Sequence, residues 1–214
     1  MYLRSYLIPQ TIAHYNSPFN GPIKVVVSFG KLYIDAGGLM QSGNFLLQTW
    51  VKGLKKLKIF QKNPQKILLL GLGGGSFIQL SKKYFPRASV LAVDIDPVIV
   101  DIGKKYLDLC ESKHVTIRIE DAQKTVARLC KQKQTFDLIF VDLYQGYQVP
   151  VFVEDAKFLR SLAELKTKNG DLIFNRLYFQ KYKNEAKKFL DKLKTLFHDV
   201  EEVHVYANLL IKVS

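Results

Sequence analysis

Three aspartates, Asp94, Asp121 and Asp142, each follow an apolar run that predicts a buried strand. The carboxyl ends of neighbouring parallel strands meet at one edge of a sheet, where open α/β proteins bind their ligands. We therefore expect the three carboxylates to line one crevice. There Asp94 would accept hydrogen bonds from ribose hydroxyls, and Asp121 with Ala122 would meet an adenine amino group. The alternative is that Asp94 and Asp121 only cap the helices that follow them, because Asp is a favoured N-cap residue.

A glycine-rich turn precedes these aspartates. Gly71, Gly73, Gly74 and Gly75 lie between the apolar run 67–72 and a predicted helix. Glycine lacks the Cβ that would keep the backbone away from a ligand, and a helix N-terminus offers free N–H groups. We expect this turn to support an electron-rich part of the same ligand, although a purely structural turn would use the same residue type.

Alternating strands and helices must bring these residues together. Strand-like runs cover residues 67–72, 89–95, 114–119, 136–142 and 171–177. Helical patterns follow them, one ending near residue 84 and the others covering about 97–108, 123–131, 153–165 and 181–197. This alternation predicts a doubly wound α/β domain.

The last residues break the alternation. Residues 199–206 and 207–214 are both strand-like, and no helix fits between them. Strands joined by so short a loop pair antiparallel. A parallel sheet closed by an antiparallel C-terminal hairpin is the class I methyltransferase arrangement, and it differs from the plain dinucleotide-binding fold. A nicotinamide-dependent oxidoreductase is therefore the hypothesis that fits least.

The N-terminal part is organised differently. Residues 23–29 and 31–35 predict a small β-hairpin that turns at Gly30, and a helix is expected over about 45–60. Asn63-Pro64 ends that helix. We divide the chain into an N-terminal extension, residues 1–63, and a class I methyltransferase-like domain, residues 64–214.

The 214 residues carry a formal net charge of +13, and lysines gather in the regions 52–66 and 181–194. Such a surface attracts the phosphates of nucleic acid, but a solvated amphipathic helix has the same composition.

The sequence has no apolar run long enough for a membrane span, no signal-peptide pattern and no histidine cluster for a metal. We expect a cytoplasmic protein with no metal site and no membrane contact.

Several motifs in a fixed order resemble the spermidine synthase-like proteins, a branch of the class I methyltransferase fold. The resemblance is carried by GLMQSG, PQKILLLGLGGGS, VDIDPVIVDIGKKYL, EDAQ and FDLIFVDLYQGYQVP. It implies that the nucleoside of S-adenosylmethionine, or of its decarboxylated form, contacts Gln41, Asp94, Ile95, Asp121 and Ala122. It also implies that the Gly71–Gly75 loop lies under the amino-acid end of this cofactor, and that two chains can form a homodimer.

Three departures from the family pattern bear on the reaction. Gly74 stands where spermidine synthases have the Asp of GGGDGG, which would repel the carboxylate of S-adenosylmethionine. Gln145 replaces the second Asp of D-S-S-D-P, which takes the proton from the attacking amine. Leu46 and Leu47 replace an acidic pair, while Trp50 keeps an aromatic wall. These changes disfavour a diamine, because a desolvated dication needs paired carboxylates.

We therefore favour methyl transfer from S-adenosylmethionine to a small-molecule acceptor held near Asp142, Tyr144 and Gln145. Methyl transfer needs little beyond positioning, because this donor is already activated. Two alternatives stay open. One is aminopropyl transfer from decarboxylated S-adenosylmethionine to a diamine, and the other is a non-catalytic nucleic-acid-binding protein on the same fold. The sequence does not identify the acceptor.

Overall fold

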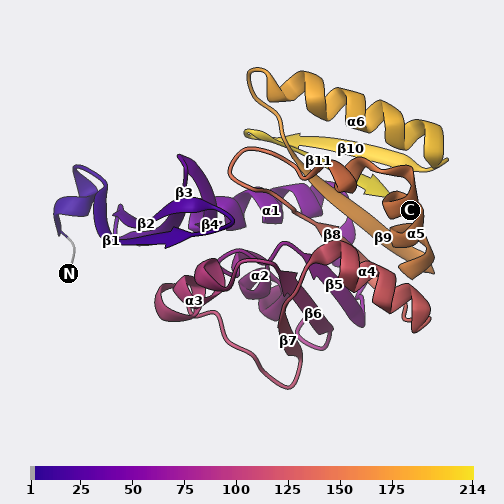
Figure 1. Cartoon of the computed structure of the whole chain (residues 1–214), viewed down its shortest axis with the longest axis horizontal. Helices are drawn as coiled ribbons and strands as arrows, with labels where there is room; N and C mark the ends of the chain where they lie inside the picture. Colours follow the sequence, from indigo (N-terminus) through magenta and orange to yellow (C-terminus); the bar gives the residue numbers. More distant parts are fainter. Residues whose placement is uncertain (1–2) are drawn as a thin grey trace.

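Two sheets organise the chain, a seven-stranded sheet in the main body and a four-stranded sheet that extends from one side (Figure 1). This computed structural model describes residues 3–214. Within that range, no helix is long and apolar enough to cross a membrane.

The seven-stranded sheet has the order β10-β11-β9-β8-β5-β6-β7. Its strands are β5 (Lys66–Leu70), β6 (Ser89–Asp94), β7 (Val115–Ile119), β8 (Phe136–Val141), β9 (Lys166–Leu177), β10 (Val200–Val205) and β11 (Asn208–Val213). Strands β5 to β9 pair parallel, and β11 pairs antiparallel with both β9 and β10. The predicted doubly wound sheet with a closing antiparallel hairpin is confirmed.

Helices cover both faces of this sheet because its strands are apolar on both sides. Ile67 and Leu69 of β5 face a core shared with α1 (Asn44–Lys56), α2 (Ser76–Tyr84) and α3 (Pro97–Tyr106). Leu68 and Leu70 face the opposite core. The helices on that side are α4 (Ala122–Lys131), α5 (Ala156–Leu165) and α6 (Tyr182–Leu196).

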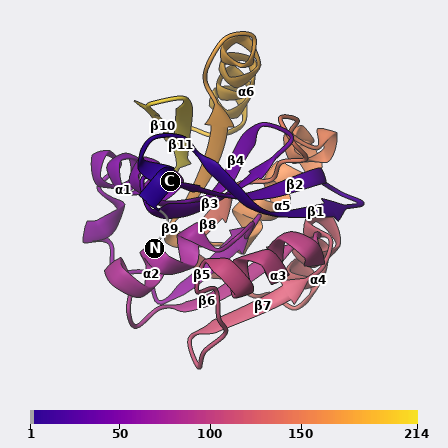
Figure 2. The same cartoon turned by 90° about the vertical axis from the view of Figure 1, so that its left-hand side faces the viewer.

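The N-terminal extension holds more strands than the predicted hairpin. Four antiparallel strands follow one another: β1 (Gln10–Ser17), β2 (Gly21–Ser28), β3 (Lys31–Ala36) and β4 (Leu39–Gly43). Figure 2 shows this sheet in front of the main body. The predicted hairpin corresponds to β2 and β3, whereas β1 and β4 were not expected, since their polar residues mask the alternation of a strand. Ile23 and Ile34 share a core with Leu69 of the main sheet, and the division at residue 63 stays a prediction.

Two predicted helices are shorter than expected. The helix predicted over 45–60 ends at Lys56, and Lys58 adopts a left-handed conformation with φ +58° before a 3₁₀ turn, η2 (Ile59–Gln61). This turn lets Leu57 and Ile59 both point into the core. The helix predicted over 153–165 divides into a 3₁₀ turn, η3 (Val151–Glu154), and α5.

Candidate functional site

The glycine turn after β5 crosses directly over the end of β8. Gly71 has φ +93°, and a Cβ at this position would overlap the backbone carbonyl of Asp142. Gly73 also has a positive φ, +52°. Only glycine adopts this conformation and this close approach without strain. The turn therefore brings the backbone after β5 into contact with the residue that ends β8.

Asp94 holds this turn in place. Its Oδ2 accepts hydrogen bonds from the N–H groups of Leu72 (2.9 Å) and Gly73 (2.7 Å), and its Oδ1 accepts one from Asp96 N–H (3.0 Å). Burial raises the pKa of Asp94, and the three N–H donors oppose that shift. The N-cap of α3 is Asp96, so the capping alternative is wrong for Asp94. A carboxylate offers about four acceptor positions, which leaves one on Asp94 for a ligand.

Asp121 caps a helix and also lines the cavity, so its contact with an adenine group stays a prediction. Its Oδ1 accepts a hydrogen bond from Lys124 N–H at 2.8 Å and so caps α4. Its side chain also lies on the cavity wall, beside Glu120. Glu120 accepts hydrogen bonds from Arg128 and Thr125, which hold its pKa below the usual range.

One cavity runs along the carboxyl ends of β5, β6, β7 and β8. Its lining combines apolar and aromatic side chains with a few polar groups, which is typical of small-molecule sites. The predicted site residues on its wall are Gln41, Gly71, Gly73, Asp94, Ile95, Asp121, Ala122, Asp142, Tyr144 and Gln145. The structure thus brings the three aspartates together, as the sequence predicts.

Gly74 and Gly75 are not among the residues that line this cavity. A Cβ at Gly74 would collide with Ile34 and Ser42, and one at Gly75 would collide with Leu109. Glycine at these two positions thus allows the turn to pack closely against the N-terminal sheet and the segment after α3. The place of Gly74 and Gly75 under a cofactor, and the cofactor preference drawn from Gly74, stay predictions.

Two cavity residues carry buried polar atoms without a partner among residues 3–214. They are the acceptor Oδ1 of Asn20 and the donor Nε2 of Gln41. Asn20 was missed by the sequence analysis, although Asn20-Gly21 is a hairpin-turn signal. Its Nδ2 donates to Asp96 Oδ2 at 2.6 Å, which fixes the side chain at the cavity. Unpaired buried polar atoms are costly, so both atoms fit a polar ligand.

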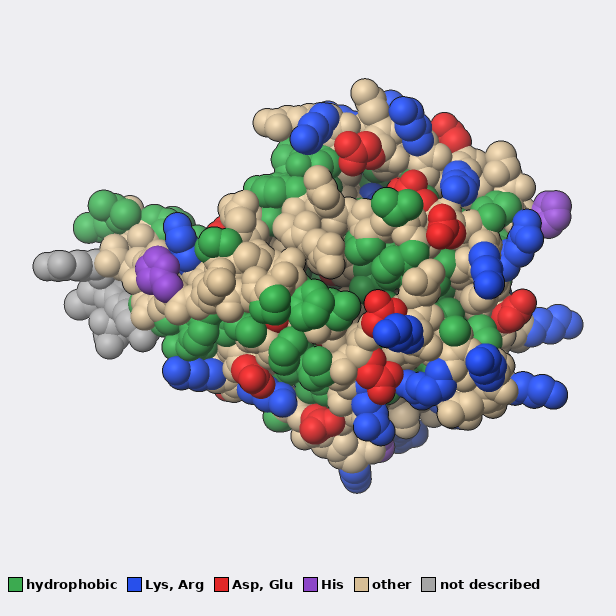
Figure 3. Space-filling view, in the orientation of Figure 1, with side chains coloured by type: hydrophobic (Ala, Val, Ile, Leu, Met, Phe, Trp, Pro, Cys, Tyr) green, Lys and Arg blue, Asp and Glu red, His purple; other side chains and the backbone are tan. Residues whose placement is uncertain are grey.

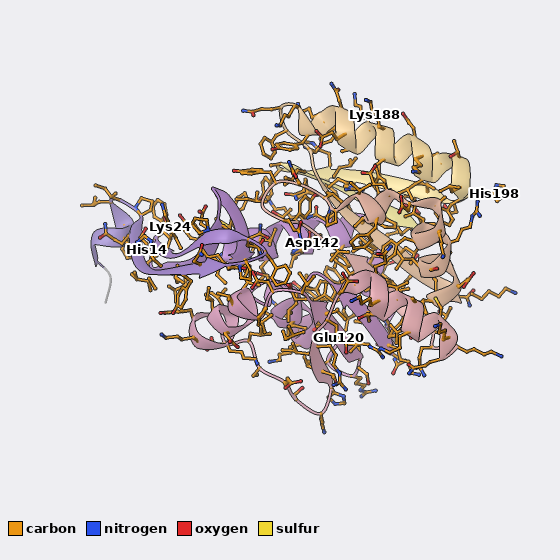
Figure 4. The ribbon with its side chains drawn as sticks, viewed as in Figure 1. His14, Lys24, Glu120, Asp142, Lys188 and His198 are labelled. Carbon is orange, nitrogen blue, oxygen red and sulfur yellow. The ribbon has the colours of Figure 1, made fainter. Side chains whose placement is uncertain are left out.

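Asp142 lies near the middle of the molecule and on the wall of the cavity (Figure 4). Its Oδ1 accepts a hydrogen bond from Asn175 Nδ2 at 2.8 Å, and Asn175 Oδ1 accepts one from Asn208 Nδ2 at 2.8 Å. Burial raises the pKa of Asp142 to about 7; the bond from Asn175 lowers it and the charge of Asp94 raises it. The carboxyl group therefore changes its charge near neutral pH. The sequence analysis missed these two asparagines, because only the pairing of β9 with β11 brings them next to Asp142.

Tyr144 forms a fixed wall beside Asp142. Its hydroxyl accepts a hydrogen bond from Leu177 N–H (2.9 Å) and donates one to the Asn175 carbonyl (3.2 Å). Burial raises its pKa further, so the phenol stays neutral. Gln145 is exposed, and its backbone pairs with Gln148 in both directions. Neither residue offers a free acid or base.

Trp50 is fully buried at the wall of the cavity, with its ring edge-on to Phe140 at 4.7 Å between centroids.

A second cavity lies on the other side of Asp142, at the ends of β4, β9 and β11. The two cavities share Gln41, Leu46, Asp142 and Tyr144. A ligand in the first cavity and a molecule in the second would thus meet at Asp142.

Known proteins resemble this arrangement. Residues 54–208 match the spermine/spermidine synthase domain. A polyamine aminopropyltransferase of Vibrio vulnificus is 29% identical over 117 residues, which cover 55% of this chain and 39% of that protein. The eEF1A lysine and N-terminal methyltransferase of Bos taurus is 27% identical over 131 residues, covering 57% of this chain and 19% of that protein.

A spermidine synthase solved in complex with the transition-state analogue AdoDATO superposes with a TM-score of 0.79. The superposition covers 96% of this chain and 73% of that one at 15% identity, so it shows the fold alone. The family assignment rests on the match to the domain, which extends over residues 54–208 and so over more than half of the chain. On this evidence the chain belongs to the spermine/spermidine synthase domain family.

Proposed function

We propose that this protein transfers a methyl group from S-adenosylmethionine to an acceptor bound beside Asp142. The observation that carries the proposal is the small number of acidic groups in the second cavity, where the acceptor would bind. Among the described residues that line the second cavity, Asp142 is the only carboxylic acid. Leu46 lies where the family has part of its acidic pair, so a diamine would lack its second partner.

The cavity residues fit the nucleoside of such a donor. Asn20 Oδ1 and Gln41 Nε2 offer an unpaired acceptor and an unpaired donor, and Asp94 keeps one acceptor position for a hydroxyl. Bound there, S-adenosylmethionine would supply a methyl group activated by its sulfonium centre. The similarity to the bovine methyltransferase supports a donor of this class.

The start of α2 favours the carboxylated form of the donor. Ser76 and Phe77, in the first turn of this helix, lie on the cavity wall. The turn contains no acidic residue. The positive end of a helix dipole attracts a carboxylate and disfavours an ammonium group. This argument is independent of the one based on Gly74.

Asp142 is placed to take a proton from a bound ammonium group, which frees the lone pair of the nitrogen. The nitrogen would then form its bond to the methyl carbon as the bond from that carbon to sulfur breaks, and the leaving group would be S-adenosylhomocysteine. The pKa of Asp142, about 7, suits proton transfer near neutral pH. Asn175 orients the carboxyl group, and Tyr144 closes the wall beside it. Gln145 has no part in this step, because it is exposed and cannot accept a proton near neutral pH.

Calorimetric titration with S-adenosylmethionine and its decarboxylated form tests the donor. We expect at least tenfold tighter binding of the carboxylated form. Ser76→Asp should reverse this preference by placing a negative charge at the start of α2, whereas the matched Ser76→Asn variant should keep it. Tighter binding of the decarboxylated form by the unmodified protein would refute the proposal.

Aminopropyl transfer is the second candidate, and the family match and the Vibrio relative support it. Incubation with putrescine and decarboxylated S-adenosylmethionine tests it directly, and turnover at ordinary enzymatic rates would establish it over methyl transfer.

Nucleic-acid binding remains a prediction. Lys and Arg side chains spread over several edges of the face in Figure 3, and one side of α6 packs Phe189 and Leu193 into the core, as in an ordinary amphipathic helix.

A further inference from the structure

We propose that the second cavity, which we call the acceptor chamber, takes a primary amine on an apolar arm that carries no second charge. This inference rests on the proposed transfer function and narrows its acceptor. The shared chemistry can come from a free alkylamine or from a lysine side chain, and the experiment below separates these sources.

The walls of the acceptor chamber are mostly apolar. Its apolar side chains come from β4, from the start of α1 and from the end of β9 with the loop that follows: Leu39, Met40, Phe45, Leu46, Leu177 and Phe179. Phe45 is 53% exposed and so lies toward solvent, whereas Asp142 is shared with the donor cavity at the inner end. Figure 3 shows a hollow with hydrophobic side chains at its border on this face. Burial of a hydrocarbon arm along these walls is favourable.

Most polar side chains of the chamber already have partners within the protein. Asn175 donates to Asp142 and accepts from Asn208, while the Tyr144 hydroxyl bonds to backbone on both sides. Gln41, which the chamber shares with the donor cavity, keeps its Nε2 unpaired. Among the described residues that line the chamber, Asp142 provides the single charge. An ammonium group at the inner end would pair with it, and a carboxylate or phosphate there would be repelled.

A second ammonium group at the other end of the arm would have no partner. Against the half-buried Leu39 or Phe179 it would lose part of its hydration without a compensating partner, which is costly. A methyl group at the same position would fit these walls. The chamber therefore distinguishes a monoamine from a diamine by the group at the far end of the arm. The near end of the arm carries the reacting nitrogen.

The test compares two ligands of nearly equal size, n-pentylamine and 1,4-diaminobutane, which differ by a methyl in place of an ammonium group. Calorimetry at about pH 8 is done with the protein alone and with S-adenosylhomocysteine present. We expect at least tenfold tighter binding of n-pentylamine. Equal or tighter binding of the diamine, or no binding of either amine, would overturn the inference. Failure of the donor proposal would appear separately, as no binding of S-adenosylhomocysteine.

Leu46→Glu supplies a second carboxylate to the chamber. We expect this variant to prefer 1,4-diaminobutane by at least tenfold, while the matched Leu46→Gln variant keeps the original order of the two ligands. Circular dichroism checks that both variants fold. If Leu46→Glu does not fold, the same comparison is made with Phe45→Glu and Phe45→Gln at the exposed mouth. An unchanged preference in the folded Glu variant would show that the arm does not reach this wall and would refute the inference.

Methyl transfer then separates the two sources of the amine. With labelled S-adenosylmethionine, n-pentylamine and Nα-acetyl-lysine amide are offered at equal concentration. Faster labelling of n-pentylamine assigns a free alkylamine, and faster labelling of the lysine derivative assigns a polypeptide side chain. Labelling of 1,4-diaminobutane above both would overturn the inference.

Discussion

The donor end and the acceptor end of the site use the same kind of residue in opposite ways. Asp94 and Asp142 both lie at the carboxyl ends of parallel strands. Asp94 accepts three backbone N–H bonds and so forms part of the frame. Asp142 accepts one bond, from the Asn175 side chain, and titrates near pH 7. The position of each aspartate at a strand end brings its carboxylate to the cavity. The backbone that follows the strand then sets how many N–H groups bond to that carboxylate.

The local chain explains this difference. After β6 the backbone turns sharply into α3, and the glycine turn after β5 lies beside it, so N–H groups surround Asp94. After β8 the chain enters the loop 143–150, where Gln145 and Gln148 bond to each other. That loop leaves Asp142 without backbone donors. The donor end is therefore rigid, and the acceptor end keeps a reactive group.

The strongest test of this contrast is Asp142→Asn. Without a proton acceptor, the rate of methyl transfer to n-pentylamine should fall about 10²–10³-fold. The dissociation constant of S-adenosylmethionine should change less than about threefold, because Asp94 and the glycine turn are intact. Stopped-flow or radiolabel assays measure the rate, and calorimetry measures the binding. Equal losses in rate and in donor binding would show that Asp142 belongs to the frame, as Asp94 does.

The pH dependence of stability gives the next effect. Folding raises the pKa of Asp142 from about 3.9 to about 7, so the folded state holds this proton more tightly. The contribution of this group to the free energy of unfolding should decrease as the pH rises from about 4 to about 7, by on the order of 3 kcal/mol, and then level off. Urea unfolding of the unmodified protein and of Asp142→Asn at several pH values isolates it as a difference. A constant difference over this range would contradict the burial argument.

Asp94→Asn tests whether the hydrogen bonds between Asp94 and the backbone around it support donor binding. The amide can still accept from Leu72 and Gly73, but its NH₂ group would face Asp96 N–H and remove the remaining acceptor position. We expect the dissociation constant of S-adenosylmethionine to rise about 10–50-fold, in line with the loss of one or two hydrogen bonds to a charged group. Calorimetry measures it. Binding as tight as that of the unmodified protein would mean that Asp94 does not contact the donor.

Asn208→Ala tests the positioning of Asp142 and should have the smallest effect. Loss of its bond to Asn175 loosens the amide that holds the carboxylate, so the pH of half-maximal transfer rate should rise by a few tenths. The rate at neutral pH should drop roughly threefold, as expected for one indirect hydrogen bond. The control is Asn184→Ala on the exposed start of α6. A pH profile that matches this control would assign Asn208 a purely structural role.

Much of the donor end could be predicted from local sequence. Buried strands show as apolar runs, and an aspartate that follows such a run must lie at the ligand-binding edge. Asn20 also carried a signal, the Asn-Gly pair, but β1 itself was hidden by polar residues. The close packing of Gly74 against Ile34 and Ser42 could not be predicted, because motif spacing locates a residue along a turn without giving the direction of its Cβ.

The order of strands and helices, the closing hairpin and the meeting of the three aspartates could all be predicted from local sequence, because they follow from apolar periodicity and from parallel pairing. The environment of each aspartate depends on the tertiary fold. Asn175 and Asn208 reach Asp142 through the antiparallel pairing of β9 with β11, and the apolar chamber forms from segments far apart in the chain. Burial and hydrogen bonding set the charge of a carboxyl group, and both depend on contacts that no local pattern records.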